Sequence, residues 1–236
     1  MRSLPSFRSR SLTPKMQQLS DALIKVPSTQ KHVRKFDLLL PTDHLDEYFK
    51  TIGFPPPTPL VVFRAECDSP DHIAEVFSDP EFQRAFVGSA EFDLPKGNWF
   101  ATDVVTRQFH SEASTGKPGV HGIMIVKVPP NIAIEQFREQ LLAAHDAYFA
   151  LPGAQKALRT HTVASPNDSM NAHIRTAGLT VAEATFIVYF EAESVEGIME
   201  VAAKADMAKH VETEMKDRGS HVDNCGFGVN VVTKIA

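Results

Sequence analysis

The chain has 236 residues, with 24 Lys and Arg against 29 Asp and Glu, a formal net charge of −5 and 43% hydrophobic residues. This composition is ordinary for a globular protein, and the negative charge argues against a general nucleic-acid binder, which needs a basic face. No run of the sequence approaches the ~18 apolar residues that a membrane-spanning helix needs, so no membrane partner is expected.

Two features bear on the cellular compartment. The only cysteines, Cys67 and Cys225, are too few for a disulfide framework, which favours a reduced intracellular protein with inert thiols. Residues 1–14 read as a basic flexible tail, because basic residues and serines occur here without an acidic residue. This composition is typical of a mitochondrial transit peptide, but it also fits a disordered tail or an extension upstream of a start at Met16. The prediction is therefore cytoplasmic, with mitochondrial as the alternative.

The segment 15–109 predicts a first unit of helices and strands, followed by a linker at 110–119 that is rich in Ser, Gly and Lys. Apolar spacing predicts helices at 16–25, 43–50 and 71–87 and strands at 31–40, 60–66 and 98–108. The run Pro-Pro-Pro-Thr-Pro at 55–59 predicts a stiff extended connector.

Residues 120–236 give the clearer pattern. Strands are predicted at 120–128, 157–163, 183–191 and 223–235, and helices at 132–149 and 195–216. Ser194 is the expected N-cap of the second helix, and the polar stretch 164–179 is expected to be a loop. The order β-α-β-β-α-β is that of a ferredoxin-like unit, whose antiparallel sheet carries both helices on one face.

Three collinear matches indicate that the chain is duplicated. Residues 26–34 resemble 151–159, residues 63–66 resemble 190–193, and residues 104–107 resemble 231–234, with shifts of 125 to 127 positions. The bare face of a ferredoxin-like sheet needs a cover, and a second copy supplies one. We therefore expect an α+β fold in which two ferredoxin-like repeats form an intramolecular dimeric α/β-barrel. By the same shift, the first repeat should lack its opening strand. A further homodimer is left open.

Two short segments carry a family resemblance. One is His145 followed by Leu151-Pro152-Gly153, and the other is Phe77-Ser78-Asp79-Pro80-Glu81-Phe82. Both resemble the EthD-type family of the dimeric α/β-barrel superfamily, in a tandem-repeat form. The chain departs from that family at Ala147, where a proline is frequent, and near Ala157, where a tyrosine is frequent. The superfamily includes cofactor-free cyclases, dehydratases and decarboxylases, quinone-forming monooxygenases, haem-binding members and accessory proteins, so the fold does not choose among them.

His145 is the best single candidate for catalysis. A neutral imidazole near pH 7 can take a proton from a carbon acid or a hydroxyl and return it, as cyclisation, dehydration and decarboxylation require. The alternative is a solvent-side or capping histidine near the end of a helix. The repeat alignment places Ser20 at the matching position of the first half, so only the second half would carry this site.

The predicted strands offer groups that could line a pocket. His121 and His161 lie among apolar neighbours, where a buried imidazole marks either a polar spot in a cavity or a satisfied structural histidine. Tyr189 could add a hydroxyl. The last strand presents Asn224 and Asn230 on the face that also carries two glycines, which indicates a close approach by a ligand or by a packed helix. Trp99 and Asp103 share a parity and could line the equivalent wall of the first half.

These patterns lead to one function and two alternatives. The ten histidines show no zinc-finger or helical metal-ligand spacing, and no phosphate-binding glycine loop or dinucleotide fingerprint occurs, so no cofactor is expected. The predicted function is cofactor-free acid–base chemistry on a small hydrophobic or aromatic molecule, such as a polyketide. The alternatives are a non-catalytic ligand-binding or stress-associated barrel, and a haem- or oxygen-dependent oxidoreductase.

Overall fold

The computed structural model describes residues 12–55, 60–87, 97–109, 119–151, 153–204, 209 and 224–236. The predicted tail and linker fall almost entirely outside these residues, and so do most of the proline-rich connector and most of 203–216. The strands are β1 (Val33–Thr42), β2 (Val62–Cys67), β3 (Thr102–Gln108), β4 (Val120–Lys127), β5 (Leu158–Pro166), β6 (Thr185–Ala192) and β7 (Cys225–Ile235). The helices are α1 (Leu12–Leu23), α2 (Pro27–His32), α3 (Asp46–Thr51), α4 (Pro70–Ser78), α5 (Pro80–Val87), α6 (Ile134–Ala150), α7 (Ala154–Ala157), α8 (Asp168–Thr176) and α9 (Val195–Ala202).

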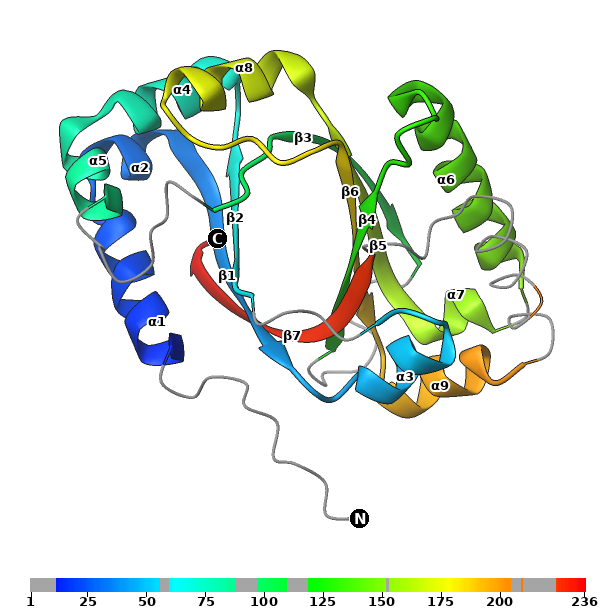
Figure 1. Cartoon of the computed structure of the whole chain (residues 1–236). Helices are drawn as coiled ribbons and strands as arrows, with labels where there is room; N and C mark the ends of the chain where they lie inside the picture. Colours follow the sequence, from blue (N-terminus) through cyan, green and yellow to red (C-terminus); the bar gives the residue numbers. More distant parts are fainter. Residues whose placement is uncertain are drawn as a thin grey trace.

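The strands form one antiparallel sheet in the order β2-β1-β7-β4-β6-β5-β3. The four strands of the second half are neighbours, in the order β7-β4-β6-β5 that a ferredoxin-like unit has. The strands of the first half are divided between the two ends of the sheet. Figure 1 shows that the sheet curls into a half-barrel with the helices on its outside. The predicted α+β class is confirmed, whereas the repeat boundaries stay a prediction.

The two edges of this sheet, β2 and β3, run in the same direction. Every neighbouring pair is antiparallel, so the direction alternates across the order and returns to its starting sense at the seventh strand. The edges therefore cannot close the sheet by pairing antiparallel with each other. In the part of the chain that the structure describes, one strand is missing between them for an all-antiparallel closed barrel.

Alternation along the strands separates an outer face from an inner one. The outer face packs against the helices through three clusters, which include Phe190 with α3, α7 and α9, Phe186 with α6, and Phe36 with α1 and α5. The inner, concave face carries a smaller apolar cluster around Ile123 and Phe227. The main core thus lies between the sheet and its helices, and the concave face is left for a mixture of apolar and polar side chains.

Two predicted elements differ from the structure. The helix expected at 71–87 divides into α4 and α5, because Pro80 cannot continue a helix and Asp79 starts a new one by accepting the Glu81 N–H at 2.7 Å. The loop expected at 164–179 contains α8, which begins where the Asn167 side chain accepts the Met170 N–H at 3.0 Å.

The predicted cap of α9 is confirmed. The Ser194 hydroxyl accepts the Gly197 N–H at 3.0 Å and caps α9, which ends at Ala202. Within the described ranges, no helix combines the length and the apolar character needed to cross a bilayer.

Candidate functional site

His145 and His161 lie together on the outer side of the sheet. His145 is on α6 and His161 on β5, and their ring centroids are 4.6 Å apart in an edge-to-face arrangement. The Phe149 ring, also on α6, lies 4.8 Å from His161. The parity shared by His161 and Val163 therefore faces the helices, and the two histidines form part of the packing between α6 and the sheet.

Burial keeps His161 neutral. The residue is 3% exposed, and its Nδ1 has no hydrogen-bond partner among the described residues. Burial, with a smaller contribution from the Arg107 cation, lowers the pKa of His161 to about 3. Arg107 itself bonds Asp146 of α6 at 2.5 Å and lies over the Phe149 ring at 5.4 Å from the centroid. This outer cluster joins the edge strand β3 to α6.

His121 and Tyr189 lie on the inner face. His121 of β4 pairs with Val229 of β7, and Tyr189 of β6 pairs with Ile123 of β4; both partners belong to the inner apolar cluster. Atom Nδ1 of His121 and the Tyr189 hydroxyl are 2.8 Å apart, and the two rings stack with centroids 5.8 Å apart. The sequence-predicted pocket residues are therefore divided between the two faces, and only this pair meets on the concave one.

The surroundings of this pair hold both groups in their neutral forms. Burial lowers the pKa of His121, and although Glu191 opposes this change, the positive charges of Arg64 and Arg159 and the His44 ring reinforce it. Burial also raises the pKa of Tyr189 well above its ordinary value. At neutral pH the pair is thus an uncharged imidazole beside an uncharged phenol.

A partly buried charge pair faces them from the first half of the chain. Arg64 of β2 donates through Nε to Asp37 of β1 at 2.9 Å, and its Nη2 contacts the same carboxylate oxygen. Asp37 is fully buried and also accepts the Thr233 hydroxyl at 2.7 Å. The guanidinium carbon of Arg64 lies 4.7 Å from the centroid of the Tyr189 ring, within cation–π range.

The second cation of the inner face is compensated as well. Arg159 donates to Glu191 at 2.9 Å and to Glu193 at 2.8 Å, and these bonds raise its pKa further. Arg64 keeps 28% of its side chain exposed and Glu191 keeps 25%, so solvent reaches the concave face. The inner site combines an apolar floor, two compensated cations and one neutral histidine–tyrosine pair.

The two asparagines predicted to line the pocket, Asn224 and Asn230, do not face the inner pair. Asn224 is 2% exposed and accepts the Lys127 N–H at 2.8 Å, which fixes the start of β7 against β4. Asn230 is exposed and pairs with Leu40. A Cβ at Gly226 would lie 2.1 Å from the Phe49 ring, so the glycine face of β7 receives helix α3. At Gly226 the explanation by a packed helix therefore applies, whereas a Cβ at Gly228 would approach Thr42 and His44, in the segment that leads into α3.

Trp99 and Asp103 are also remote from the inner pair. The Trp99 ring lies 5.0 Å from Phe86 within the aromatic cluster that covers β1 and β2 from outside. Asp103 is exposed and accepts the Asn167 side-chain amide at 2.9 Å. The first contact belongs to the packing around α5 and the second joins β3 to the start of α8, so neither residue lies beside His121.

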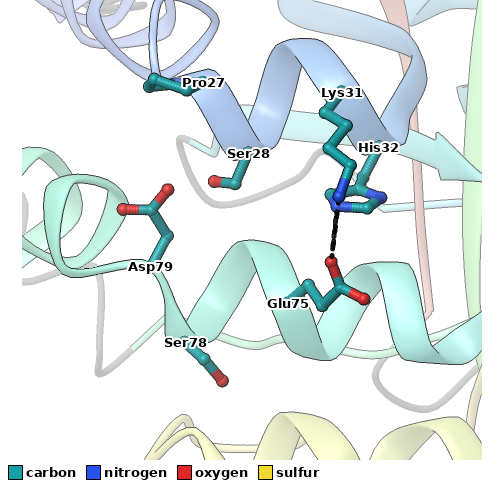
Figure 2. Close-up of a pocket in the computed structure, with 7 residues that line it drawn as sticks. All are labelled: Pro27, Ser28, Lys31, His32, Glu75, Ser78 and Asp79. Carbon is teal, nitrogen blue, oxygen red and sulfur yellow. Dashed lines mark ion pairs between the residues drawn. The ribbon is translucent and has the colours of Figure 1, made fainter.

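Apart from the concave face of the sheet, a hollow lies on the outer surface of the molecule, between α2 and α4. Its volume is about 390 Å³, and Figure 2 shows its lining by Pro27, Ser28, Lys31, His32, Glu75, Ser78 and Asp79. His32 and Lys31 both pair with Glu75, at 2.6 and 3.8 Å. Hydrogen bonding from Ser28 is the main cause that lowers the pKa of Asp79. The charges here are paired locally, and the hollow contains none of the predicted site residues, although Ser78 and Asp79 belong to the segment that resembles the EthD-type family.

Metal ligation finds no support in the described ranges, where no group of three or more His, Cys, Asp or Glu side chains could hold an ion. Burial raises the pKa of Cys67 and Cys225, so both thiols stay protonated at neutral pH.

Comparison with known proteins supports the fold. No family model matches the chain, and no curated protein matches it. A solved "putative monooxygenase" of Fusobacterium nucleatum superposes with a TM-score of 0.52 at 7% identity, over 94% of this chain and 87% of its own. An anthrone oxidase-like protein superposes with a TM-score of 0.50 at 13% identity, over 89% of this chain and 95% of its own. At these identities the likeness establishes a shared α+β half-barrel architecture.

Proposed function

We propose that this protein is an enzyme of small-molecule metabolism that removes a proton from an aromatic substrate held against the inner face of the sheet. His121 is the proton acceptor. The observation that carries the proposal is the hydrogen-bonded pair of His121 and Tyr189, which is half-buried, uncharged and in contact with a compensated arginine. A base whose pKa lies below neutral is fully available at pH 7.

The pair works in one tautomer. When Nδ1 of His121 carries the proton and donates it to the Tyr189 oxygen, Nε2 has the free lone pair. Nε2 then takes a proton from an acidic C–H or O–H of the substrate: that bond breaks, an N–H bond forms, and the electron pair stays on the substrate. Tyr189 remains a phenol because its pKa is raised, and its own proton is free to donate to the substrate anion.

Arg64 supports the charged state that follows. Its guanidinium lies over the Tyr189 ring and bears a positive charge next to the place where the substrate anion develops. Positive charge on a half-buried face stabilises such an anion more than bulk water does. The imidazolium that forms at the same time is favoured by Glu191, the cross-strand partner of His121.

The substrate is a neutral, largely apolar molecule. Asp37 compensates Arg64, and two glutamates compensate Arg159, so neither arginine calls for a carboxylate or phosphate on the substrate. Between the charged groups, the floor consists of Ile123, Ile187 and other apolar side chains. An aromatic ring with a weakly acidic proton fits this combination, which agrees with the class of ligand expected from the sequence.

The barrel itself is proposed to consist of two ferredoxin-like units of the EthD type. The edge strands of such a unit are its fourth and second, so two units that close on each other join fourth to second at both seams. The β7–β1 and β3–β5 pairs fit this arrangement. The position left between β2 and β3 corresponds to the opening strand of the first unit, the strand that the sequence predicts to be missing.

Oxidation by dioxygen is the second candidate function. It is favoured by the two structural neighbours described above, one named a putative monooxygenase and the other anthrone oxidase-like. The carbanion left by proton removal from a ring CH₂ would give its electrons to O₂. Overall, two C–H bonds break, one oxygen atom becomes a carbonyl, and the other leaves as water with both hydrogens. Removal of the first proton by His121 is common to both candidates.

Anthrone, a neutral tricyclic ketone with an acidic CH₂, is a suitable probe. In anaerobic D₂O, exchange of its CH₂ protons above the buffer rate measures proton removal alone; in air, oxygen uptake and anthraquinone formation measure oxidation. We expect His121→Gln to lower the exchange rate at least about 100-fold, the usual contribution of a general base. Tyr189→Phe should lower it about tenfold, the loss of one net hydrogen bond.

His145→Gln is the matched control, because His145 lies on the other side of the sheet. Its rate should stay within twofold of the wild type. If His145→Gln abolished exchange while His121→Gln kept it, the role proposed for His121 would be lost and the one predicted for His145 supported. Binding of anthrone by calorimetry without any exchange would favour the non-catalytic barrel instead.

A further inference from the structure

One charged residue of the inner face is buried without touching His121 or Tyr189. Asp37 lies in the middle of β1, is 0% exposed, and is followed by three leucines. Enclosing a carboxylate is costly unless it is well paired, and a buried ion pair adds little net stability compared with apolar residues of the same volume. The presence of this carboxylate in an apolar strand calls for an explanation other than stability.

The contacts of Asp37 lead to the histidine–tyrosine pair. Asp37 and Arg64 are direct cross-strand partners, and both contacting nitrogens of Arg64 reach one oxygen, Oδ2, of the carboxylate. The other oxygen, Oδ1, accepts the Thr233 hydroxyl. This arrangement fixes the guanidinium with its carbon 4.7 Å from the Tyr189 ring centroid, and Tyr189 in turn meets His121 Nδ1 at 2.8 Å.

We propose that Asp37 is a positioning residue: through Arg64 and Tyr189 it holds His121 in the Nδ1–H tautomer, with Nε2 ready to accept a proton. The inference rests on the proposed function of His121. It deepens that function by making the first half of the chain part of the site, because Asp37 and Arg64 come from β1 and β2, whereas Tyr189 and His121 come from β6 and β4. The first half of the chain, which lacks the proton acceptor, thus sets the tautomer of His121 in the second half.

The chain of contacts gives a physical reason for the proposed tautomer. A free imidazole in water favours the Nε2–H form slightly, so a single Nδ1–H form needs an acceptor fixed at Nδ1. The Tyr189 hydroxyl can accept from Nδ1 or donate to it; in the proposed state its own proton points toward the substrate side and its oxygen accepts. This orientation requires a ring that is held in place, and the Arg64 guanidinium lies over that ring. Without its carboxylate anchor, the long Arg64 side chain regains its rotamers and leaves the ring. The imidazole then samples both tautomers.

The test uses ¹⁵N-histidine-labelled full-length protein without substrate. Ring nitrogen shifts report the tautomer of His121 at pH 7.5, with the resonance assigned by its loss in His121→Gln. We expect a single Nδ1–H form in the wild type and a mixture of both tautomers in Asp37→Asn. Asp21→Asn is the control, since it breaks the Asp21–Lys234 ion pair outside the inner face and should leave the tautomer unchanged.

A double-mutant cycle separates positioning from simple loss of structure. Arg64→Met breaks the same chain of contacts at a side chain that is 28% exposed. This variant therefore remains informative if Asp37→Asn, at the buried end of the chain of contacts, folds poorly. If Asp37 acts through Arg64, adding Asp37→Asn to Arg64→Met produces no further change in the tautomer ratio. Additive effects of the two changes, or an unchanged single tautomer in both single variants, would overturn the proposal.

Kinetics supply an independent readout with anthrone as the probe. Asp37→Asn is expected to lower kcat for exchange about tenfold, equivalent to one net hydrogen bond, with KM within twofold of the wild type. A rise in KM with unchanged kcat would place Asp37 in substrate binding and overturn positioning. Failure of His121→Gln to lose exchange would overturn the proposed function, while the substrate-free tautomer measurement would still decide on Asp37.

Discussion

Arg64 and Tyr189 are in contact although their strands stand four steps apart in the sheet. Between β2 and β6 lie β1, β7 and β4. Neighbouring strands are about 4.8 Å apart, so a flat sheet would separate the two residues by about 19 Å. Instead the guanidinium carbon lies 4.7 Å from the ring centroid. The curl of the sheet therefore assembles the inner site, and it gives His121 charged neighbours from both halves of the chain.

This arrangement predicts a pH dependence that can be shifted in either direction. His121 acts as a base when neutral, so kcat/KM should rise with pH through its pKa and level off above it. Because that pKa is lowered, the midpoint of the rise should lie below pH 6.5, the ordinary pKa of histidine. Arg64→Met removes a cation, which should raise the pKa and move the acid limb toward higher pH. Rates of anthrone exchange between pH 4.5 and 8 measure the limb.

Glu191→Gln is the opposite change on the same face. It removes the carboxylate that favours the imidazolium and leaves the charge of Arg159 less compensated, so the limb should move toward lower pH. His44 and Tyr189 are unchanged in both variants. If the two variants shifted the limb in the same direction, the limb would belong to a group other than His121.

His161 predicts a separate pH effect, on stability. Its pKa is about 3 in the folded protein and about 6.5 in the unfolded chain. Below pH 6.5 the unfolded chain takes up a proton that the folded protein refuses, so the folded state loses stability as pH falls. Between pH 7 and pH 5 the loss from this one group amounts to about 2 kcal/mol. Urea unfolding at both pH values measures it.

His161→Phe is expected to remove about that much of the pH dependence, since phenylalanine does not titrate and its ring suits the contacts with Phe149. His173→Gln provides the comparison, because His173 is exposed on α8 and should leave the difference between the two pH values unchanged. If His161→Phe lost as much stability between pH 7 and pH 5 as the wild type, the folded protein would protonate this imidazole as readily as the unfolded chain does.

Local sequence patterns predict most of the fold, because the signals for a strand or a helix cap come from residues that are close together in the sequence. The β-branched run at 120–128 became β4, and Ser194 caps α9 as expected. The helix α8 was missed because its polar residues resemble those of a loop, although Asn167 as a cap and Met170 and Ile174 at helical spacing were the available signals. The break before α5 could have been predicted from Pro80 alone.

The inner site could be predicted only in part, since it depends on contacts between distant residues. His121 and Tyr189 stood out as polar groups on apolar strands. Asp37 and Arg64 were not chosen, although a carboxylate directly before three leucines is a signal of a buried charge with a partner. No local pattern could give that partner, because register and curl decide it. For the same reason, alternation alone did not tell which parity faces the helices, so His161 was grouped with His121.

The edge strand β3 predicts a tendency to associate. Val104 and Val105 are 61% and 49% exposed, on a strand whose outer edge has no partner strand among the described residues. Exposed apolar edge strands template pairing with other chains, and lysine there opposes it. Val104→Lys should therefore lower the apparent mass at high protein concentration in analytical ultracentrifugation, with stability changed by less than about 0.5 kcal/mol.

Val104→Thr keeps the β-branched shape without adding charge, so it distinguishes repulsion from lost strand propensity and should associate more than Val104→Lys. If the wild type and both variants were all monomeric at high concentration, the β3 edge would not promote association.

The close packing of α3 against Gly226 predicts that any side chain at this position destabilises the protein. A Cβ at this position would lie 2.1 Å from the ring of Phe49, which is 1% exposed and cannot move into solvent without leaving the core. Gly226→Ala should therefore destabilise the protein by about 1–3 kcal/mol, the range for overpacking a core. Gly197→Ala makes the same chemical change in helix α9, where the nearest atom is 3.4 Å away, and should stabilise by about 0.5–1 kcal/mol. Urea unfolding of both variants compares them, and equal effects would mean that α3 is free to shift away from β7.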